Sequence, residues 1–367
     1  TYPAMDSSKE CRAFSSAPFA LVAEYAVEAD TLDGYSASDF QQRVSGACTP
    51  GSTVQSVNED GSVTCLPLYP HLSQIITSVD ESGDVGWYTS LAIGADGLPL
   101  ISYYDATNSD LKVAHCNDLA CESATLTTLD SDGLVGTSTS ITIGTDNLGI
   151  ISYRDQTNQS LKVANCNTEL CTSATINVID ADMVTGDTSI TMSFNGTPLI
   201  SYYANGDLRV ASCNTPNCQL TATIHTLDST GDVGKYSSIT IGRDAYPIIS
   251  YYDSTNGAVK VAHCTSSSCS TSDTYTLDTT DDSGKSTSII IGVDGHAMIA
   301  YHRYESTGYN RIMLAYCSTT VCDTAIKQQS LLISLDYVGL YSSIAIGMDG
   351  LPILSVYAED LRTLHFA

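Results

Sequence analysis

Six segments of closely similar sequence follow one another at regular intervals, and this repetition limits the fold more than any other feature of the chain. Each segment begins with a Ser followed mostly by β-branched residues, and the intervals between them are 50, 49, 49, 50 and 55 residues. Self-similarity at such a period is the signature of repeat architectures. The six segments are Ser90–Gly94, Ser140–Gly144, Ser189–Ser193, Ser238–Gly242, Ser288–Gly292 and Ser343–Gly347.

Each repeat has the pattern of four short strands joined by turns. In the first repeat, the dipeptide Asp96-Gly97 suits a tight hairpin turn, and the apolar stretch Pro99–Tyr104 follows it. The stretches Leu111–Cys116 and Ala124–Asp130 supply a third and a fourth strand. Four strands per repeat, with no helical period between them, are typical of β-propeller blades. The first strand is the most uniform and has the smallest side chains, so we expect it to line the central axis.

The two ends of the repeated region predict how the ring closes. The sixth repeat stops at Ala367 without a cysteine pair or a fourth strand. The stretch Leu72–Asp80, ahead of the first repeat, has the pattern of the fourth strands at Thr223–Asp228 and Thr274–Asp278. We therefore predict an all-β fold, a six-bladed β-propeller of four-stranded blades over residues 72–367. In this fold the N-terminal strand closes the ring by completing the last blade.

Thirteen cysteines are too many, and too regularly placed, for a reducing compartment. Ten of them form a C-x4-C pair in each of five repeats, at the turn before the fourth strand. Zinc is the competing explanation, but zinc sites favour C-x2-C spacing and bring two pairs together, whereas a ring would hold these pairs apart. We predict a secreted protein, extracellular or on the cell surface, with the disulfides Cys116–Cys121, Cys166–Cys171, Cys213–Cys218, Cys264–Cys269 and Cys317–Cys322.

Residues 1–71 do not share the repeat, and we expect them to form a small N-terminal arm. The Ala-rich stretch Ala17–Asp30 predicts a short helix, with a Pro near its start and apolar residues on one face. The stretch Val54–Thr64 predicts a hairpin with its turn at Asp60-Gly61. The chain begins at Thr1 rather than Met, so we expect a mature protein from which a targeting segment has been removed.

Three further cysteines lie in this arm. Cys48 and Cys65 flank the predicted hairpin and are expected to pair. Cys11 is then left for an intermolecular bond. The alternatives are that Cys11 pairs with one of the other two, or that it stays reduced.

Two parts of the chain resemble known proteins. The repeats, of the form S-I-x-I-G-x-D-G-x-P-x-I-S-Y-Y-D followed by L-K-V-A-x-C, resemble those of secreted bacterial β-propellers. The arm segments Pro18–Ala26 and Ala29–Gly34 are similar to a segment of bacterial surface proteins and phage tail fibres, which connects modules or mediates assembly. The first resemblance implies an architecture and no activity, because one fold hosts many functions. The second implies that the arm takes part in assembly.

The charge of the chain excludes some partners. Fifteen basic and forty-one acidic side chains give a net charge of −26, which repels nucleic acids and anionic membrane surfaces. No apolar run approaches the roughly 18 residues of a membrane-spanning helix, so membrane insertion is not expected either. The acidity is compatible with Ca²⁺ binding or with saline surroundings, and also with an ordinary solvated surface.

No known catalytic motif is present in the sequence. G-x-S-x-G, HExxH, the P-loop and dinucleotide-binding fingerprints are all missing. The arginines do not recur at equivalent positions of the repeats, as a sialidase-like carboxylate site would need. We therefore expect no enzyme and no catalytic residues.

Acidic loops after the second strand are the strongest candidates for a ligand site. Three repeats place an Asp there with an Asn three residues later, and these loops could bind Ca²⁺ or hydrogen-bond a sugar. Asp and Asn also favour turns for purely local reasons, so the loops equally suit a structural role. The pairs are Asp105 with Asn108, Asp155 with Asn158 and Asp253 with Asn256.

These observations lead to three functional hypotheses. The first is a non-enzymatic extracellular structural protein whose propellers assemble through the arm into a homo-oligomer or surface filament. The second is a glycan-binding adhesin or lectin that uses the repeated Asp, Asn and Tyr loops. The third is a glycan-active hydrolase or lyase, for which a pocket on the propeller axis with convergent carboxylates would be needed.

Overall fold

The structure is a computed structural model, and it describes residues 52–57, 62–67, 77–219, 222–306, 308, 310–329, 338–347, 349–358 and 363–366. The chain divides into two compact units, Thr1–Ile75 and Ile76–Ala367. In the first unit, β1 (Ser52–Val57) and β2 (Val63–Pro67) pair antiparallel, which confirms the predicted hairpin.

Several predictions for the arm lie outside the described residues. They are the helix at Ala17–Asp30, the intermolecular bond of Cys11, and the pairing of Cys48 with the side chain of Cys65. The role of the arm in assembly therefore stays a prediction.

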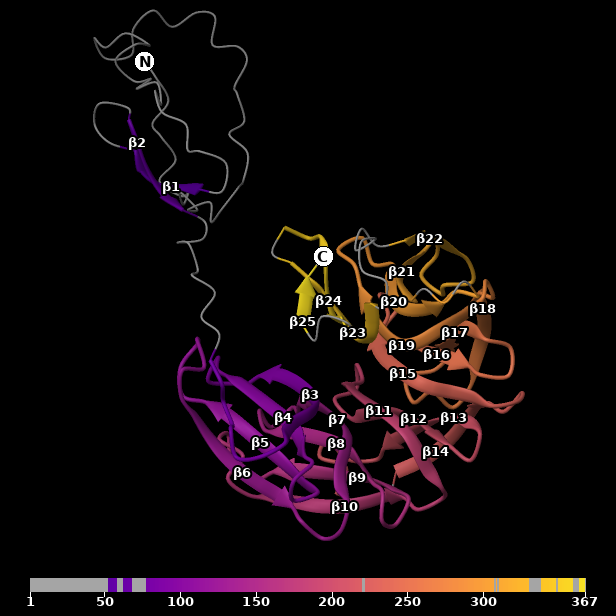
Figure 1. The fold of residues 1–367 in the computed structure, drawn as a ribbon, viewed down its shortest axis with the longest axis horizontal. Coiled ribbons are helices and arrows are strands. Elements are labelled where there is room, and N and C mark those ends of the chain that lie inside the picture. Colours follow the sequence, from indigo (N-terminus) through magenta and orange to yellow (C-terminus); the bar gives the residue numbers. More distant parts are fainter. Residues whose placement is uncertain are drawn as a thin grey trace, which may run out of the picture. The chain divides into compact units, whose positions relative to one another are not determined.

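The second unit is a six-bladed β-propeller, as predicted. Six antiparallel sheets follow one another along the chain and surround a common axis (Figure 1). Five sheets have four strands, and the sixth has three among the described residues. Within each sheet, the strands lie in the order of the sequence. No helix in the described part of the chain is long and apolar enough to cross a membrane.

Each strand position recurs from blade to blade. The first strands are β3 (Val85–Ile93), β7 (Val135–Ile143), β11 (Val184–Met192), β15 (Val233–Ile241), β19 (Asp282–Ile291) and β23 (Val338–Ile346). The second strands are β4 (Pro99–Asp105), β8 (Gly149–Asp155), β12 (Pro198–Ala204), β16 (Pro247–Asp253), β20 (Ala297–Tyr304) and β24 (Pro352–Ala358). The third strands are β5 (Asp110–Cys116), β9 (Ser160–Cys166), β13 (Asp207–Cys213), β17 (Ala258–Cys264), β21 (Asn310–Cys317) and β25 (Thr363–Phe366). The fourth strands are β6 (Ala124–Asp130), β10 (Ala174–Asp180), β14 (Ala222–Asp228), β18 (Ser272–Asp278) and β22 (Ala325–Gln329).

The repeated Ser of each first strand joins neighbouring blades. The first strands of successive blades contact one another from β3 to β23, which confirms that they are the innermost strands. The Oγ atom of Ser90 accepts a hydrogen bond from the backbone N–H of Ile141 in the next blade, at 3.1 Å. The same bond links Ser140 to Ile190, Ser189 to Ile239, Ser238 to Ile289 and Ser288 to Ile344.

Apolar side chains fill the space between consecutive blades. Between the first two blades, Leu111 and Val113 of β5 pack with Val135, Ile151 and Tyr153 of the second blade, and all five are buried. Burying a side chain of this size contributes about 1.5–3 kcal/mol. Equivalent clusters lie at the next four interfaces. This core holds the inner strands in fixed positions around the axis.

A carboxylate at the end of four of the five described fourth strands also links two blades. Asp130 accepts hydrogen bonds from Tyr153 at 2.6 Å and from Lys162 at 3.1 Å, both in the following blade. The carboxylates that accept a bond from the equivalent tyrosine at the next three interfaces are Asp180, Asp228 and Asp278.

Asp80 bonds to the first blade in the same way, through Tyr103 and Lys112. Asp80 is the last residue of the strand predicted to close the ring, and its bonds match those of the residues that end the fourth strands, although residues 77–80 are not part of a strand. Residues 72–76 of that strand lie outside the described part of the chain.

Five disulfides close the turns between the third and fourth strands, at the predicted pairs. Their Cα–Cα distances are 4.8 to 5.0 Å, and the second Cys of each pair has a left-handed backbone conformation with φ between 50 and 59°. Such a bond pins the edge strand of a blade to its neighbour. These disulfides agree with an oxidising compartment.

Candidate functional site

A backbone irregularity recurs at the same position of five inner strands. The residue two places before the repeated Ser has a positive φ, of 54° at Tyr88, 55° at Tyr236 and 60° at Tyr341. Ser138 and Ser286 share this conformation. It is rare for residues other than Gly, and a bulky side chain adopts it only when its surroundings impose it.

The strand pairing shifts at these positions, as in a β-bulge, for example between Trp87 and Ser90. Bulges redirect side chains, and they concentrate next to active sites. In the third blade the same position is held by Asp187, and there the pairing shifts between Val184 and Thr188. The irregularity therefore marks one position in all six blades.

A cavity of about 140 Å³ opens among these residues on the axis. Its lining comes from five of the six blades, with β11, β15, β19 and β23 on the far side from β3. The lining consists of Tyr88, Asp187, Tyr236, Ser237, Ser286, Thr287, Tyr341 and Ser342. The cavity is therefore walled by three phenol rings, one carboxyl group and four hydroxyl groups.

Two tyrosines of the wall are supported from behind by tyrosines of the second strand. The ring of Tyr88 lies 6.4 Å from the ring of Tyr104, and the ring of Tyr236 lies 6.1 Å from that of Tyr252, both pairs being tilted. Aromatic pairs at such distances attract each other and limit the motion of each ring. The wall thus presents fixed aromatic surfaces.

The hydroxyl groups of the lining are fixed by bonds between blades. Ser342 donates to the carbonyl oxygen of Ser286 at 2.7 Å, and Thr287 donates to the carbonyl oxygen of Tyr236 at 2.6 Å. Ser237 shares a bond of 3.0 Å with Ser201. A ligand in the cavity would therefore meet hydroxyl groups whose orientation the fold has already set.

Asp187 is the one carboxyl group in the lining of this cavity. Burial raises its pKa, while a hydrogen bond from Ser138 to its Oδ1 atom, at 2.9 Å, and the charge of Arg154 act in the opposite direction. The Nε atom of Arg154 donates to the carbonyl oxygen of Val184 at 3.0 Å, which fixes the guanidinium near the carboxyl group. Asp187 therefore retains its proton at a higher pH than an ordinary Asp and is suited to donate it.

Asp282, on the inner strand of the fifth blade, is perturbed in the opposite direction. Burial alone would raise its pKa, but bonds from Lys285, at 2.6 Å, and from Tyr252 hold the pKa below the usual range. Burial raises the pKa of Tyr236, and the charges of both Asp187 and Asp282 add to this effect. The pKa values of Asp187 and Asp282 are thus shifted in opposite directions.

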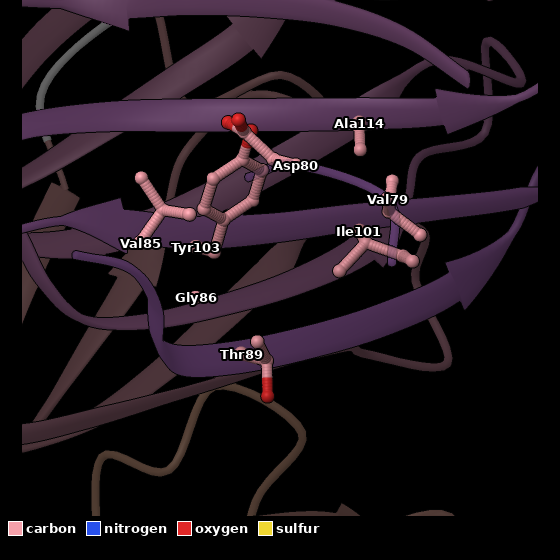
Figure 2. Close-up of a pocket in the computed structure, with 8 residues that line it drawn as sticks. All are labelled: Val79, Asp80, Val85, Gly86, Thr89, Ile101, Tyr103 and Ala114. Carbon is pink, nitrogen blue, oxygen red and sulfur yellow. The ribbon is translucent and has the colours of Figure 1, made fainter. Parts of the chain in front are cut away.

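A second cavity, of about 210 Å³, lies on the first blade (Figure 2). Figure 2 shows Val85, Ile101 and Tyr103 around it, with the Tyr103 ring directed toward Asp80. At the other described interfaces, the residues equivalent to Ile101 are fully covered by the preceding blade: Ile151, Ile200, Ile249 and Ile299. This cavity is therefore part of the packing surface that faces the sixth blade.

The acidic loops predicted from the sequence do not reach the axial cavity, and each closes on itself. In the first blade, the backbone and side-chain nitrogens of Asn108 donate to the two carboxylate oxygens of Asp105, at 3.0 and 2.9 Å. Asp155 with Asn158 and Asp253 with Asn256 make the same two bonds.

These three carboxylates are buried and belong to three separate turns. Among the described residues, no three His, Cys, Asp or Glu side chains gather in a way that would hold a metal ion. Calcium or sugar binding at the loops stays a prediction.

Comparisons with known proteins identify the fold. No protein-family model and no curated protein matches this sequence. A protein of unknown function from Dyadobacter fermentans has 10% identity and a TM-score of 0.55, over 79% of this chain and 95% of its own. The α-L-arabinofuranosidase Arb93A from Fusarium graminearum has 10% identity and a TM-score of 0.50, over 77% and 92%. AofleA from Arthrobotrys oligospora has 11% identity and a TM-score of 0.50, over 78% and 84%.

These matches overturn the expectation of a non-enzymatic structural protein that assembles into a filament. Arb93A, one of the solved structures with a similar fold, is a glycoside hydrolase. The expectation was wrong because it relied on the absence of a known motif. A site on the axis takes single residues from different blades, so it leaves no contiguous motif in the sequence.

The sequence contains a signal for the axial residues that the repeat alignment overlooks. Two places before the repeated Ser, the six units carry Tyr, Ser, Asp, Tyr, Ser and Tyr, while the residues that follow hardly vary. A position that varies inside an otherwise uniform inner strand is free of the packing constraint, and it is available for a ligand.

Proposed function

We propose that this protein is a glycoside hydrolase that acts from the axial cavity, with Asp187 as the proton donor. The observation that carries the proposal is a carboxyl group in a cavity with three tyrosine rings at the propeller axis, where burial raises its pKa. Tyrosine rings stack on the apolar faces of sugars, and hydroxyl groups bond to their edges. The similarity in fold to an α-L-arabinofuranosidase adds support.

The proposed chemistry uses two carboxyl groups with separate tasks. Asp187 gives its proton to the glycosidic oxygen as the bond from that oxygen to the anomeric carbon breaks. Water adds to the anomeric carbon, and the proton that the water loses passes to a base. Asp282 is the candidate for this base because it is ionised and acts on the same tyrosine as Asp187. The leaving sugar departs as a neutral alcohol.

The experiment is a hydrolysis screen with the purified full-length chain. The substrates are p-nitrophenyl glycosides, beginning with the α-L-arabinofuranoside, together with arabinan and galactan. Wild type should release sugar, and Asp187→Asn should lower kcat by ~10²-fold or more, as expected for loss of a general acid. Asp132→Asn, a matched change at an exposed loop residue, should leave the rate unchanged. An absence of turnover on every substrate would refute the proposal.

The disulfides also bear on the location of the protein. A secreted protein, outside the cell or on its surface, is supported by the five disulfides, which suit an oxidising compartment. The arm would then link the propeller to another module or to a second copy. Light scattering of the full-length chain, with and without residues 1–71, tests this role.

A further inference from the structure

The size of the axial cavity limits the part of a glycan that it can hold. Its volume of about 140 Å³ is well below the roughly 300–1,000 Å³ of pockets for drug-sized ligands. A volume of this order has room for a single sugar ring. The substrate class inferred below rests on the proposed function.

The walls of the cavity exclude a chain that passes through it sideways. The lining residues come from the inner strands of five different blades, so the walls on several sides of the cavity belong to the fixed inner strands. A polymer cleaved in its middle needs a groove with an exit on either side of the reacting ring. A chain end needs only one opening.

The charges around the cavity point to a neutral sugar. No Lys or Arg is among the lining residues, and Asp187 is the one titratable carboxyl group there. Arg154 lies behind Asp187, bonded to the carbonyl oxygen of Val184. A uronic or sialic acid would therefore find no cation in the lining, and it would enter a chain of net charge −26.

We infer that the axial cavity takes one neutral sugar ring at the end of a chain, so that the enzyme is exo-acting and releases monosaccharides. The bond that breaks joins the ring in the cavity to the next sugar. The oxygen of that next sugar receives the proton of Asp187 and leaves with the shortened chain. Water supplies the hydroxyl group of the released monosaccharide.

The experiment follows the products formed from an oligosaccharide of six sugars, labelled at its reducing end, of the type that the wild type hydrolyses. An exo-acting enzyme releases unlabelled monosaccharide from the first time point, and the labelled chain shortens one sugar at a time. Blocking the terminal ring with a bulky acetal should abolish cleavage. Labelled fragments of two to four sugars at early times, without monosaccharide, would overturn the inference and leave the hydrolase proposal intact. No cleavage at all would overturn the hydrolase proposal itself.

A variant that opens one wall gives a second measurement. Tyr341 is 64% exposed, so Tyr341→Ala removes a wall of the cavity without a large loss of core packing. The variant should bind the terminal ring less well, with KM raised about tenfold or more, as expected for loss of an apolar contact. It should also release some disaccharide. Tyr246→Ala, at an exposed turn residue outside the cavity lining, is the control and should behave as wild type. An unchanged product pattern and KM in Tyr341→Ala would contradict the placement of the sugar.

Discussion

Tyr103 donates a hydrogen bond of 2.7 Å to the carboxylate of Asp80, a residue that precedes the first strand of the first blade. Tyr153 makes the same bond, at 2.6 Å, to Asp130, the last residue of a fourth strand. Asp80 therefore stands where the fourth strand of the sixth blade should end. The bond ties the segment ahead of the first blade to the place where the ring has to close.

We expect Asp80→Ala and Asp130→Ala to destabilise the propeller by similar amounts, about 2–4 kcal/mol each. Each change leaves a buried tyrosine hydroxyl group without its partner and removes one of the two carboxylates that face a lysine ammonium group. Urea unfolding of the two variants measures the loss, and the exposed change Asp132→Ala serves as the control. If Asp80→Ala were as stable as wild type while Asp130→Ala was not, Asp80 would have no part in closing the ring.

Stability should decrease as the pH falls from about 4 toward 2. Burial opposes ionisation of Asp80 and Asp232, but bonds from lysine and tyrosine outweigh it and lower both pKa values to about 2. In the unfolded chain the same groups titrate near 3.8. The native chain therefore binds fewer protons in this window, so its extra stability is present above pH 4 and is lost on acidification.

Thermal melts between pH 6 and pH 2 measure this dependence, and Asp80→Asn should make the acid slope shallower. A slope equal to that of wild type would show that Asp80 does not titrate with a lowered pKa.

The proposed hydrolase activity should fall as the pH rises through the raised pKa of Asp187, because only the protonated acid can donate. Ser138→Ala removes a hydrogen bond that favours the ionised form, so it should raise this pKa further and move the alkaline limb of kcat/KM to higher pH. Ser286→Ala, at the equivalent position of the fifth blade, is the comparison and should leave the limb in place. A shift of the Ser138→Ala limb toward lower pH would contradict the assignment.

Asp187 should also affect the stability of the fold. Its folded pKa is above the unfolded value, so the stability associated with it is complete below the unfolded pKa and is lost as the pH rises through the folded pKa. The stability of Asp187→Asn relative to wild type should therefore be higher at pH 8 than at pH 4. Equal differences at the two values would argue against a raised pKa.

Removing one disulfide should cost about 2 kcal/mol, because a bridge between residues five apart closes a short loop and restricts the unfolded chain only modestly. The variant for this test replaces Cys213 and Cys218 together by Ser, so that no free thiol remains. Guanidinium unfolding measures the change, and reduced and non-reduced mass spectra confirm the bridge in wild type. A wild-type chain that reacts with thiol reagents at these two residues would contradict the bridge.

The architecture was accessible from the sequence because it depends on local patterns that recur. Short patterns within one repeat determine each part of a blade. The turn comes from the dipeptide Asp96-Gly97, the strand from the apolar stretch Pro99–Tyr104, and the disulfide from the C-x4-C pair. Because the same pattern occurs in six repeats, an ambiguous strand in one repeat can be assigned from the other five. The closing strand stays a prediction from the same kind of pattern, since Leu72–Asp80 resembles the other fourth strands.

The axial site was not accessible in this way because its residues are about fifty to one hundred positions apart and form no contiguous motif. Tyr88, Asp187 and Ser286 meet only because bulges turn the inner strands at one level of the ring. The acidic loops stood out in the sequence for the opposite reason. Asp105 and Asn108 form a conspicuous motif, but the two side chains bond to each other and so satisfy a turn.

The bond from an inner-strand Ser to the amide of the following blade has a consequence for how such a chain can evolve. Every described junction uses the same acceptor and the same donor, so a blade gained or lost through unequal recombination would find a matching neighbour on both flanks. The residue two places before the repeated Ser, in contrast, differs between units and is Tyr, Ser or Asp. The residues at the axis can therefore change in evolution while the hydrogen bonds between neighbouring blades stay the same.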